Sequence, residues 1–139
     1  MPHIIVEYSA NLETHADIPG LIRTVHQAAL SSGLFAKAAV RTRGERRDVF
    51  AIADEHPKNA FVATTVRMAA GRPEAERQRL ADLVFDAVCG YLDRAGPHGR
   101  LALSFEIQEI VEVGARRRNA LHALPMGAAA TAAVAPETR

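Results

Sequence analysis

The chain has 139 residues, of which 48% are hydrophobic and 24% are charged, values that are ordinary for a soluble globular protein. Its formal net charge is +1, so there is no global field to attract nucleic acid or a membrane, and an anion must be bound by locally placed arginines. Cys89 is the only cysteine, which excludes an intrachain disulfide and a cysteine metal cluster. No signal peptide or membrane-spanning run is evident, so we expect a cytoplasmic protein.

The first half of the chain predicts a strand, a helix and a second strand. We expect the first strand over residues 3–8, followed by a polar loop. Asp17 is a suitable N-cap for a helix that stops near Gly33. The apolar positions of this helix follow helical spacing and are Ile18, Leu21, Ile22, Val25 and Ala29. A second strand is predicted over residues 38–43.

The second half repeats this pattern after a polar, turn-rich segment at residues 44–59, in which residues 48–53 are an alternative short strand. Residues 60–68 predict a strand, and residues 71–74 predict a helix start with proline at the first helical position and an acid in the first turn. The apolar stripe of this helix consists of Leu80, Leu83, Val84, Ala87, Val88 and Tyr91. Residues 101–107 alternate between apolar and smaller or polar side chains, which predicts a half-buried strand.

The fold class predicted from this pattern is α+β, with two layers built from tandem β-α-β units. Four strands form one sheet, with both helices on one face. The other face is partly apolar, so we expect another subunit to cover it. We predict a single domain over residues 1–124, with halves at about 2–58 and 59–124, and a disordered C-terminal tail at 125–139, which has no periodicity.

Pro2 follows Met1 directly and opens the first predicted strand. Cytosolic processing usually removes an initiator methionine that precedes proline, which would leave a secondary amine held at the end of a rigid strand. Such an amine can act as a base, whereas the same nitrogen is a tertiary amide without basicity if Met1 stays. Most Met-Pro openings have no function, but a strand that begins at the proline ties down a terminus that normally frays.

Three arginines are candidates for anion binding. Arg72 lies near a helix start, where a cation opposes the helix dipole but where anions bind well, so it either holds a carboxylate or is simply solvated. Arg41 and Arg43 lie two residues apart on a predicted strand and therefore share a face. Their mutual repulsion indicates either a nearby anion or a charge-guarded edge strand.

Other features of the sequence carry less chemistry. The run Arg116–Arg118 has few aromatic neighbours, which favours a solvated or interface patch over a nucleic-acid site. The six histidines show no metal-ligand spacing, and no phosphate-binding or nucleophile motif is present.

Several short segments, each common alone, form a specific combination in unbroken order from residue 2 to residue 124. They are Pro2–Ser9, Ala16–Leu21, Val40–Arg43, Ala60–Val62, Ala70–Arg72, Leu101–Ile107 and Asn119–Leu124. Together they closely resemble the 5-carboxymethyl-2-hydroxymuconate Δ-isomerase family of the tautomerase superfamily. Residues 114–118 and those after residue 124 match this family poorly, which affects the expected substrate preference more than the expected base.

The resemblance implies a tautomerase-like fold and a homotrimer with one site in each subunit. It implies that Pro2 is the catalytic base and that Arg41 and Arg72 bind substrate carboxylates, with Arg43 as a lesser candidate for substrate contact. The second half begins inside the chain and cannot supply a free amine. No metal or organic cofactor is implied, and no nucleic-acid or membrane partner is expected.

The resemblance also implies an activity in the breakdown of homoprotocatechuate-type aromatic compounds. The enzyme would move a proton from the 2-hydroxyl of a small polycarboxylate enol, 5-carboxymethyl-2-hydroxymuconate, to a distant carbon. One alternative is another enzyme of the superfamily, such as a phenylpyruvate-type tautomerase or a dehalogenase-like hydratase. A second alternative is a non-catalytic trimer that binds ligands.

Overall fold

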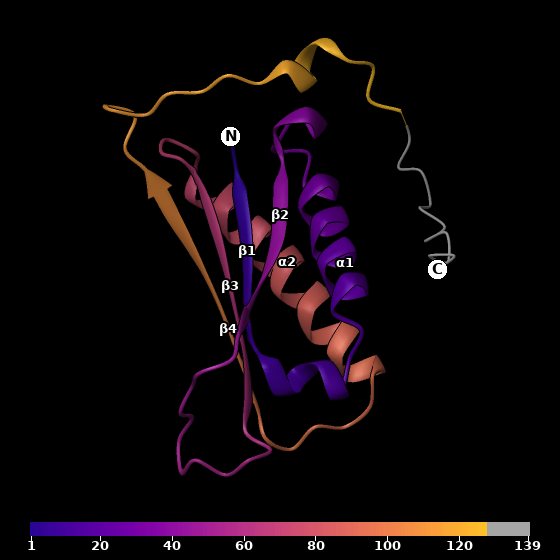
Figure 1. Cartoon of the computed structure of the whole chain (residues 1–139). Helices are drawn as coiled ribbons and strands as arrows, with labels where there is room; N and C mark the ends of the chain where they lie inside the picture. The colour runs from indigo at the N-terminus through magenta and orange to yellow at the C-terminus, as the bar shows by residue number, and fades with distance from the viewer. Residues whose placement is uncertain (128–139) are drawn as a thin grey trace, which may run out of the picture.

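The fold is that of a computed structural model and is described for residues 1–127 of the chain. Four strands form one mixed sheet in the order β2-β1-β3-β4 (Figure 1). The strands are β1 (His3–Ser9), β2 (Arg41–Arg47), β3 (Ala60–Ala69) and β4 (Leu101–Ile110). Two helices, α1 (Ile18–Ser31) and α2 (Glu74–Arg94), lie on one face of the sheet, as predicted. Three short 3-10 helices complete the fold, η1 (Ala10–Thr14), η2 (Lys37–Ala39) and η3 (Ala120–Ala123).

The strands bury alternate side chains against the helices because successive side chains of a strand point to opposite faces. In β1 the buried residues on this face are Ile4, Val6 and Tyr8, and in β3 they include Val62, Val66 and Met68. The two helices supply the other layer of one hydrophobic core, through buried residues that repeat every three or four positions. These are Ile18, Leu21, Val25 and Ala29 of α1 and Leu80, Val84, Val88 and Leu92 of α2.

The helix starts differ in how they are capped. At α1, the Asp17 carboxylate accepts a hydrogen bond from the Gly20 backbone N–H (3.2 Å), which confirms the predicted N-cap. Helix α2 begins at Glu74 with Pro73 as its N-cap, so proline stands one position before the predicted one and no side chain caps the helix. The two helices meet where the Tyr91 hydroxyl donates to the Asp17 carbonyl oxygen (2.8 Å).

The second strand is displaced from its predicted position. It begins at Arg41 rather than at residue 38, because Lys37–Ala39 form η2, in which the Ala39 N–H donates to the Ala36 carbonyl (2.9 Å). It continues through Gly44 to Arg47, which the sequence analysis assigned to a turn-rich segment. This extension pairs in parallel with β1, and Arg47 bonds to Glu7 on that strand (2.9 Å). Charge pairing between strands here replaces the apolar pattern on which strand prediction depends.

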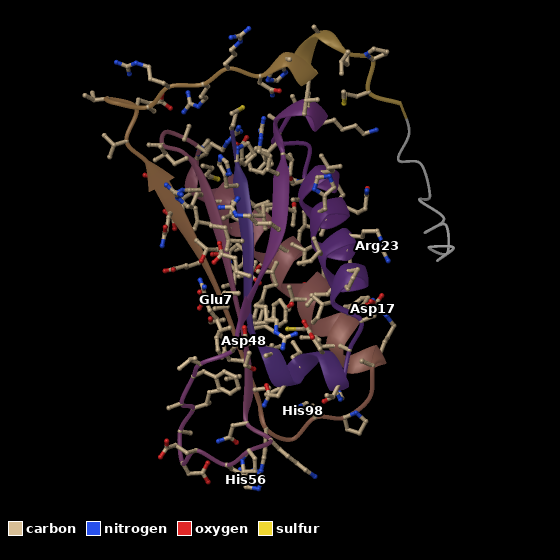
Figure 2. The ribbon with its side chains drawn as sticks, in the orientation of Figure 1. Glu7, Asp17, Arg23, Asp48, His56 and His98 are labelled. Carbon is tan, nitrogen blue, oxygen red and sulfur yellow. The ribbon has the colours of Figure 1, made fainter. Side chains whose placement is uncertain are left out.

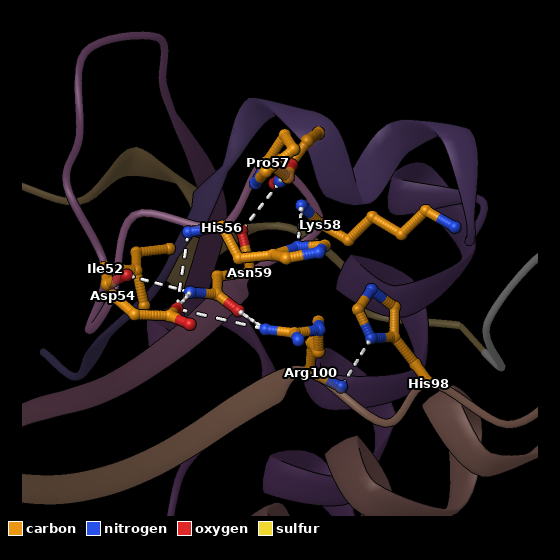
Figure 3. Close-up of polar contacts among 9 residues, drawn as sticks. Ile52, Asp54, His56, Pro57, Lys58, Asn59, His98 and Arg100 are labelled. Atoms are coloured by element: carbon orange, nitrogen blue, oxygen red, sulfur yellow. Dashed lines mark hydrogen bonds and ion pairs between the residues drawn. The ribbon is translucent and has the colours of Figure 1, made fainter.

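Residues 48–59 form a long loop at the end of the sheet opposite the N-terminus, and the alternative short strand at 48–53 is not present. Buried Asn59 holds this loop together (Figure 3). Its amide nitrogen donates to the Ile52 carbonyl (2.9 Å) and to the Asp54 carboxylate (2.7 Å), and its amide oxygen accepts from Arg100 (3.1 Å). The loop is therefore fastened to the start of β4.

The second face of the sheet is not covered by either helix (Figure 1). It presents half-buried apolar and small side chains on the two central strands, namely Ile5, Phe61, Ala63 and Thr65. Residues 128–139, most of the predicted disordered tail, lie outside the described residues. Within residues 1–127, no helix combines the length and the apolar character that crossing a membrane requires.

Candidate active site

The strand directions bring the predicted site residues to one end of the sheet. Strand β2 is parallel to β1, with His3 opposite Arg41, so both strands start at this end. Strand β3 runs antiparallel to β1 and β4 runs parallel to β3, so β3 and β4 both finish there. The start of β2 at Arg41 and the residues just after β3, which include Arg72, therefore lie at the same end as the N-terminus. The segment after β4 also passes this end (Figure 1).

Pro2 is buried at the entry of the central strand β1. Its carbonyl oxygen accepts a hydrogen bond from the Arg41 backbone N–H (3.2 Å), which ties the start of β1 to the start of β2. This bond and the burial hold in place a chain end that would otherwise fray. The backbone nitrogen of Pro2 thus has a defined position beside β2.

The Arg41 and Arg72 side chains are held by separate contacts. The half-buried Arg41 guanidinium donates to the Ala39 carbonyl oxygen (2.8 Å). The Arg72 guanidinium lies over the Phe35 ring, 5.1 Å from the ring centroid, and 4.0 Å from the Glu76 carboxylate one helical turn later. Stacking on an aromatic ring leaves the edge of a guanidinium free to grip a carboxylate in a two-pronged manner.

The electrostatic environment of the chain end disfavours a protonated amine. Burial lowers the pKa of the Met1 α-amino group below its ordinary value. The positive charge of Arg117 lowers this pKa further and is followed in effect by Arg41 and Arg72, while the Glu112 carboxylate acts in the opposite direction. An amine one residue further along the chain lies in the same surroundings.

Arg43 lies on the same strand and face as Arg41, two residues further from the N-terminal end of the sheet, and pairs with Ile5 of β1. Its guanidinium contacts the ring Nδ1 of His3 (3.2 Å) and the Glu45 carboxylate (3.7 Å). Burial lowers the pKa of His3, and the charge of Arg43 lowers it further, so the imidazole is neutral near pH 7. These contacts place Arg43 at the margin of the group formed by Pro2, Arg41 and Arg72.

Two charged residues of this end, Arg117 and Glu112, were not predicted as site residues from the sequence. They form a two-pronged ion pair, with N–O distances of 3.1 and 3.4 Å, in the segment that follows β4. The run Arg116–Arg118 was interpreted as a solvated or interface patch because nothing in the local sequence sets one arginine apart. The missing signal was the antiparallel pairing of β1 with β3, which directs the chain leaving β4 to the N-terminus.

A separate hollow of about 620 Å³ lies at the opposite end of the molecule. His15 and His98 contact each other edge to face in its wall, and Lys58 and Arg100 add positive charge. Figure 2 shows His56 and His98 at this far end, away from the N-terminal strand end. Within residues 1–127, no group of three or more His, Cys, Asp or Glu side chains is arranged to hold a metal ion.

Comparison with known proteins identifies the family. Residues 2–124 match the 5-carboxymethyl-2-hydroxymuconate isomerase family. The chain belongs to this family. It is 35% identical over 124 residues to the 5-carboxymethyl-2-hydroxymuconate Delta-isomerase of Escherichia coli, covering 89% of this chain and 98% of the relative. The resemblance inferred from the sequence is thereby confirmed, and the chain is an isomerase by family.

Solved structures of family members have the same fold. A 5-carboxymethyl-2-hydroxymuconate isomerase from Deinococcus radiodurans R1 is 31% identical, with a TM-score of 0.81 over 88% of this chain and 92% of that chain. A second structure, of a 5-carboxymethyl-2-hydroxymuconate delta-isomerase, is 27% identical, with a TM-score of 0.82 over 92% of this chain and 95% of that chain. The predicted fold class, a four-stranded sheet with two helices on one face, is confirmed.

Proposed function

We propose that this isomerase acts on 5-carboxymethyl-2-hydroxymuconate in the cytosolic breakdown of homoprotocatechuate-type aromatic compounds. Removal of Met1 in the cytosol frees the Pro2 nitrogen, which serves as the general base. Arg41 and Arg72 bind carboxylates of the substrate, and Arg43 is a lesser contact at the margin of the site. No cofactor takes part in the reaction as proposed.

The position of Pro2 is the observation that carries this proposal. Pro2 is buried at the start of the central strand, its carbonyl accepts a hydrogen bond from the Arg41 N–H, and the charges of Arg41 and Arg72 act on the adjacent Met1 amine. Burial and positive neighbours both favour the neutral form of an amine. A neutral secondary amine near pH 7 is a suitable base, because proton transfer is most efficient when the pKa lies near the working pH.

The reaction moves one proton and rearranges the double bonds. The neutral Pro2 nitrogen takes the proton from the 2-hydroxyl, and the electron pair of that O–H bond forms the ketone. The conjugated double bonds shift along the chain toward a distant carbon, which receives the same proton from the pyrrolidinium. Arg41 and Arg72 hold the carboxylates and stabilise the negative charge that spreads over the conjugated system between the two transfers. The base is neutral again at the end, so proton and electrons balance.

We also propose that the enzyme is a homotrimer. The sheet face opposite the helices is uncovered and presents Ile5, Phe61, Ala63 and Thr65, of which all but Thr65 are apolar. A partly apolar sheet face of this kind is normally covered in the assembled protein. A trimer that packs these faces together would carry one Pro2 site in each subunit.

The test combines mass spectrometry with kinetics on 5-carboxymethyl-2-hydroxymuconate. We expect the purified active protein to lack Met1, and Pro2→Ala to reduce kcat by about 100-fold or more, the usual contribution of a positioned base. Pro19→Ala is the control, because Pro19 is exposed at the start of α1. Full activity of a preparation that retains Met1, or of the Pro2→Ala enzyme, would exclude Pro2 as the base.

A further inference from the structure

We propose that Arg117 is a third carboxylate-binding residue of the active site, for which the carboxymethyl arm of the substrate competes with Glu112. The inference rests on the proposed function and adds to it a determinant of substrate specificity. It concerns residues 114–118, for which the sequence analysis found no close resemblance to the family.

The first argument is a count of charges. The proposed substrate carries three carboxylates, one at each end of the muconate chain and one on the carboxymethyl arm. Arg41 and Arg72 supply two guanidinium groups, and two such groups grip two carboxylates in two-pronged geometry. Arg43 contacts His3 and Glu45 at the margin of the site, so the third carboxylate needs a further cation, since taking an unpaired charge out of water is costly.

The path of the chain after β4 brings Arg117 near the N-terminal end of the sheet. Residues 111–119, which we call the strap, cross the end of the sheet above the N-terminus, from the β4 edge toward η2 beside the start of β2 (Figure 1). The strap is fastened at its far side, where the Asn119 amide donates to the Ala38 carbonyl oxygen (2.8 Å). A second hydrogen bond joins η2 to the chain beyond η3, where Lys37 donates to the Gly127 carbonyl oxygen (2.8 Å). The backbone of the strap is thereby held above the N-terminal end of the sheet.

The three consecutive arginines of the strap differ in their contacts. Arg117 pairs with Glu112 through both guanidinium edge nitrogens, and its side chain is 35% exposed. Its charge is the strongest positive influence on the chain-end amine. All three arginines are exposed, but Arg116 instead donates to its neighbouring Ala115 carbonyl (2.8 Å). Arg117 is therefore the one of the three whose orientation and charge point to a role at the chain end.

Glu112 gives the contact its specificity. A carboxylate already held in two-pronged geometry shows that the Arg117 guanidinium is oriented to bind one. A substrate carboxylate has to compete with Glu112 for this position. A substrate with the third carboxylate can replace Glu112 on Arg117 and so gains binding affinity. A dicarboxylate leaves Arg117 paired with Glu112 and gains none.

The experiment compares two ligands that differ only in the arm. KM is measured for 5-carboxymethyl-2-hydroxymuconate, and 2-hydroxymuconate, which has two carboxylates, is measured by its inhibition constant against that substrate. Both constants are measured at a pH above the acid limb of kcat/KM, where the amine is neutral with or without the Arg117 charge. There we expect Arg117→Ala to raise KM about tenfold with little change in kcat, as for a lost charge-assisted hydrogen bond, and to leave the inhibition constant unchanged. Arg116→Ala is the matched control and leaves both constants unchanged.

Two further variants keep the test decisive if the strap tolerates alanine poorly. Arg117→Lys restores part of the affinity for the tricarboxylate, and Glu112→Gln lowers its KM because the competing carboxylate is gone. The inference is overturned if Arg117→Ala changes both ligands equally or neither, or if Glu112→Gln weakens the tricarboxylate. Failure of the proposed function is distinct, because the unaltered enzyme would then not isomerise 5-carboxymethyl-2-hydroxymuconate at all.

Discussion

At the scale of single residues, the chemistry depends on the field in which the Pro2 nitrogen lies. An isolated α-amino group has a pKa of about 7.7–8.0 and is mostly protonated at neutral pH. At this end of the sheet, burial and the charges of Arg117, Arg41 and Arg72 lower the pKa of the Met1 α-amino group. In the proposed mechanism, the arginines that bind the anionic substrate would also keep the Pro2 base neutral.

This double role predicts the pH dependence of kcat/KM. If the neutral Pro2 amine is the active form, as proposed, we expect kcat/KM to fall as the pH drops through the pKa of Pro2, in a limb below the ordinary range of about 7.7–8.0. Arg72→Ala removes a charge that disfavours protonation, so the limb moves to higher pH. Arg23→Ala on α1 is the control, because Arg23 pairs with Asp17 (3.9 Å) away from the site (Figure 2). A limb that stays in place or moves to lower pH in Arg72→Ala would contradict the electrostatic account.

At the scale of elements, the contact between α1 and α2 shows how packing overrides local preference. Gly20 lies in the first turn of α1, where alanine is the better helix former by about 1 kcal/mol. A Cβ atom at Gly20 would overlap the Tyr91 hydroxyl and would lie 2.6 Å from the Asp17 carboxylate. The Tyr91 hydroxyl has little freedom to move, because it donates to the Asp17 carbonyl (2.8 Å).

We therefore expect Gly20→Ala to lower the free energy of unfolding by about 1–3 kcal/mol, as overpacking does, instead of raising it. Urea unfolding at fixed protein concentration measures the change. Gly90→Ala in α2 is the matched control, since a Cβ there meets only the flexible end of Arg94 at 3.3 Å, and it should be neutral or stabilising. In a Tyr91→Phe background the cost of Gly20→Ala should shrink. A Gly20→Ala protein as stable as the unaltered one would show that the two helices separate easily.

At the scale of the whole molecule, the two halves of the chain share one core. Buried residues of the first half, such as Leu21, and of the second half, such as Val84, belong to the same cluster, and the central pair β1 and β3 joins the halves. We propose on this basis that residues 1–124 fold as one domain. The free sheet face is then the remaining surface available for assembly.

A charge on this face tests the assembly. Ala63 lies at the centre of β3, opposite Glu7 of β1 and Ser104 of β4. Ala63→Glu places a second carboxylate beside Glu7, and in a trimer packed through this face the new charge would be buried, so we expect subunits that no longer associate. Size-exclusion chromatography with light scattering reports the mass. Gln27→Glu on the exposed side of α1 should leave the assembly intact, and an Ala63→Glu protein of unchanged mass would place the interface elsewhere.

The sequence by itself determined the elements whose cause is local. The Asp17 cap and the alternation in residues 101–107 depend on neighbours a few positions away, so they were predicted correctly. The predicted stripe of α2 is correct at Leu80, Val84 and Val88, but it omitted the buried Leu92 and included Leu83, Ala87 and Tyr91, which are only partly buried. The tertiary structure alone decided the rest. Strand β2 runs to Arg47 through charge pairing with β1, and the antiparallel pairing of β1 with β3 brings the strap to Pro2. Such pairings join residues tens of positions apart, and their energy is realised only when the chain has folded, so no local pattern records them.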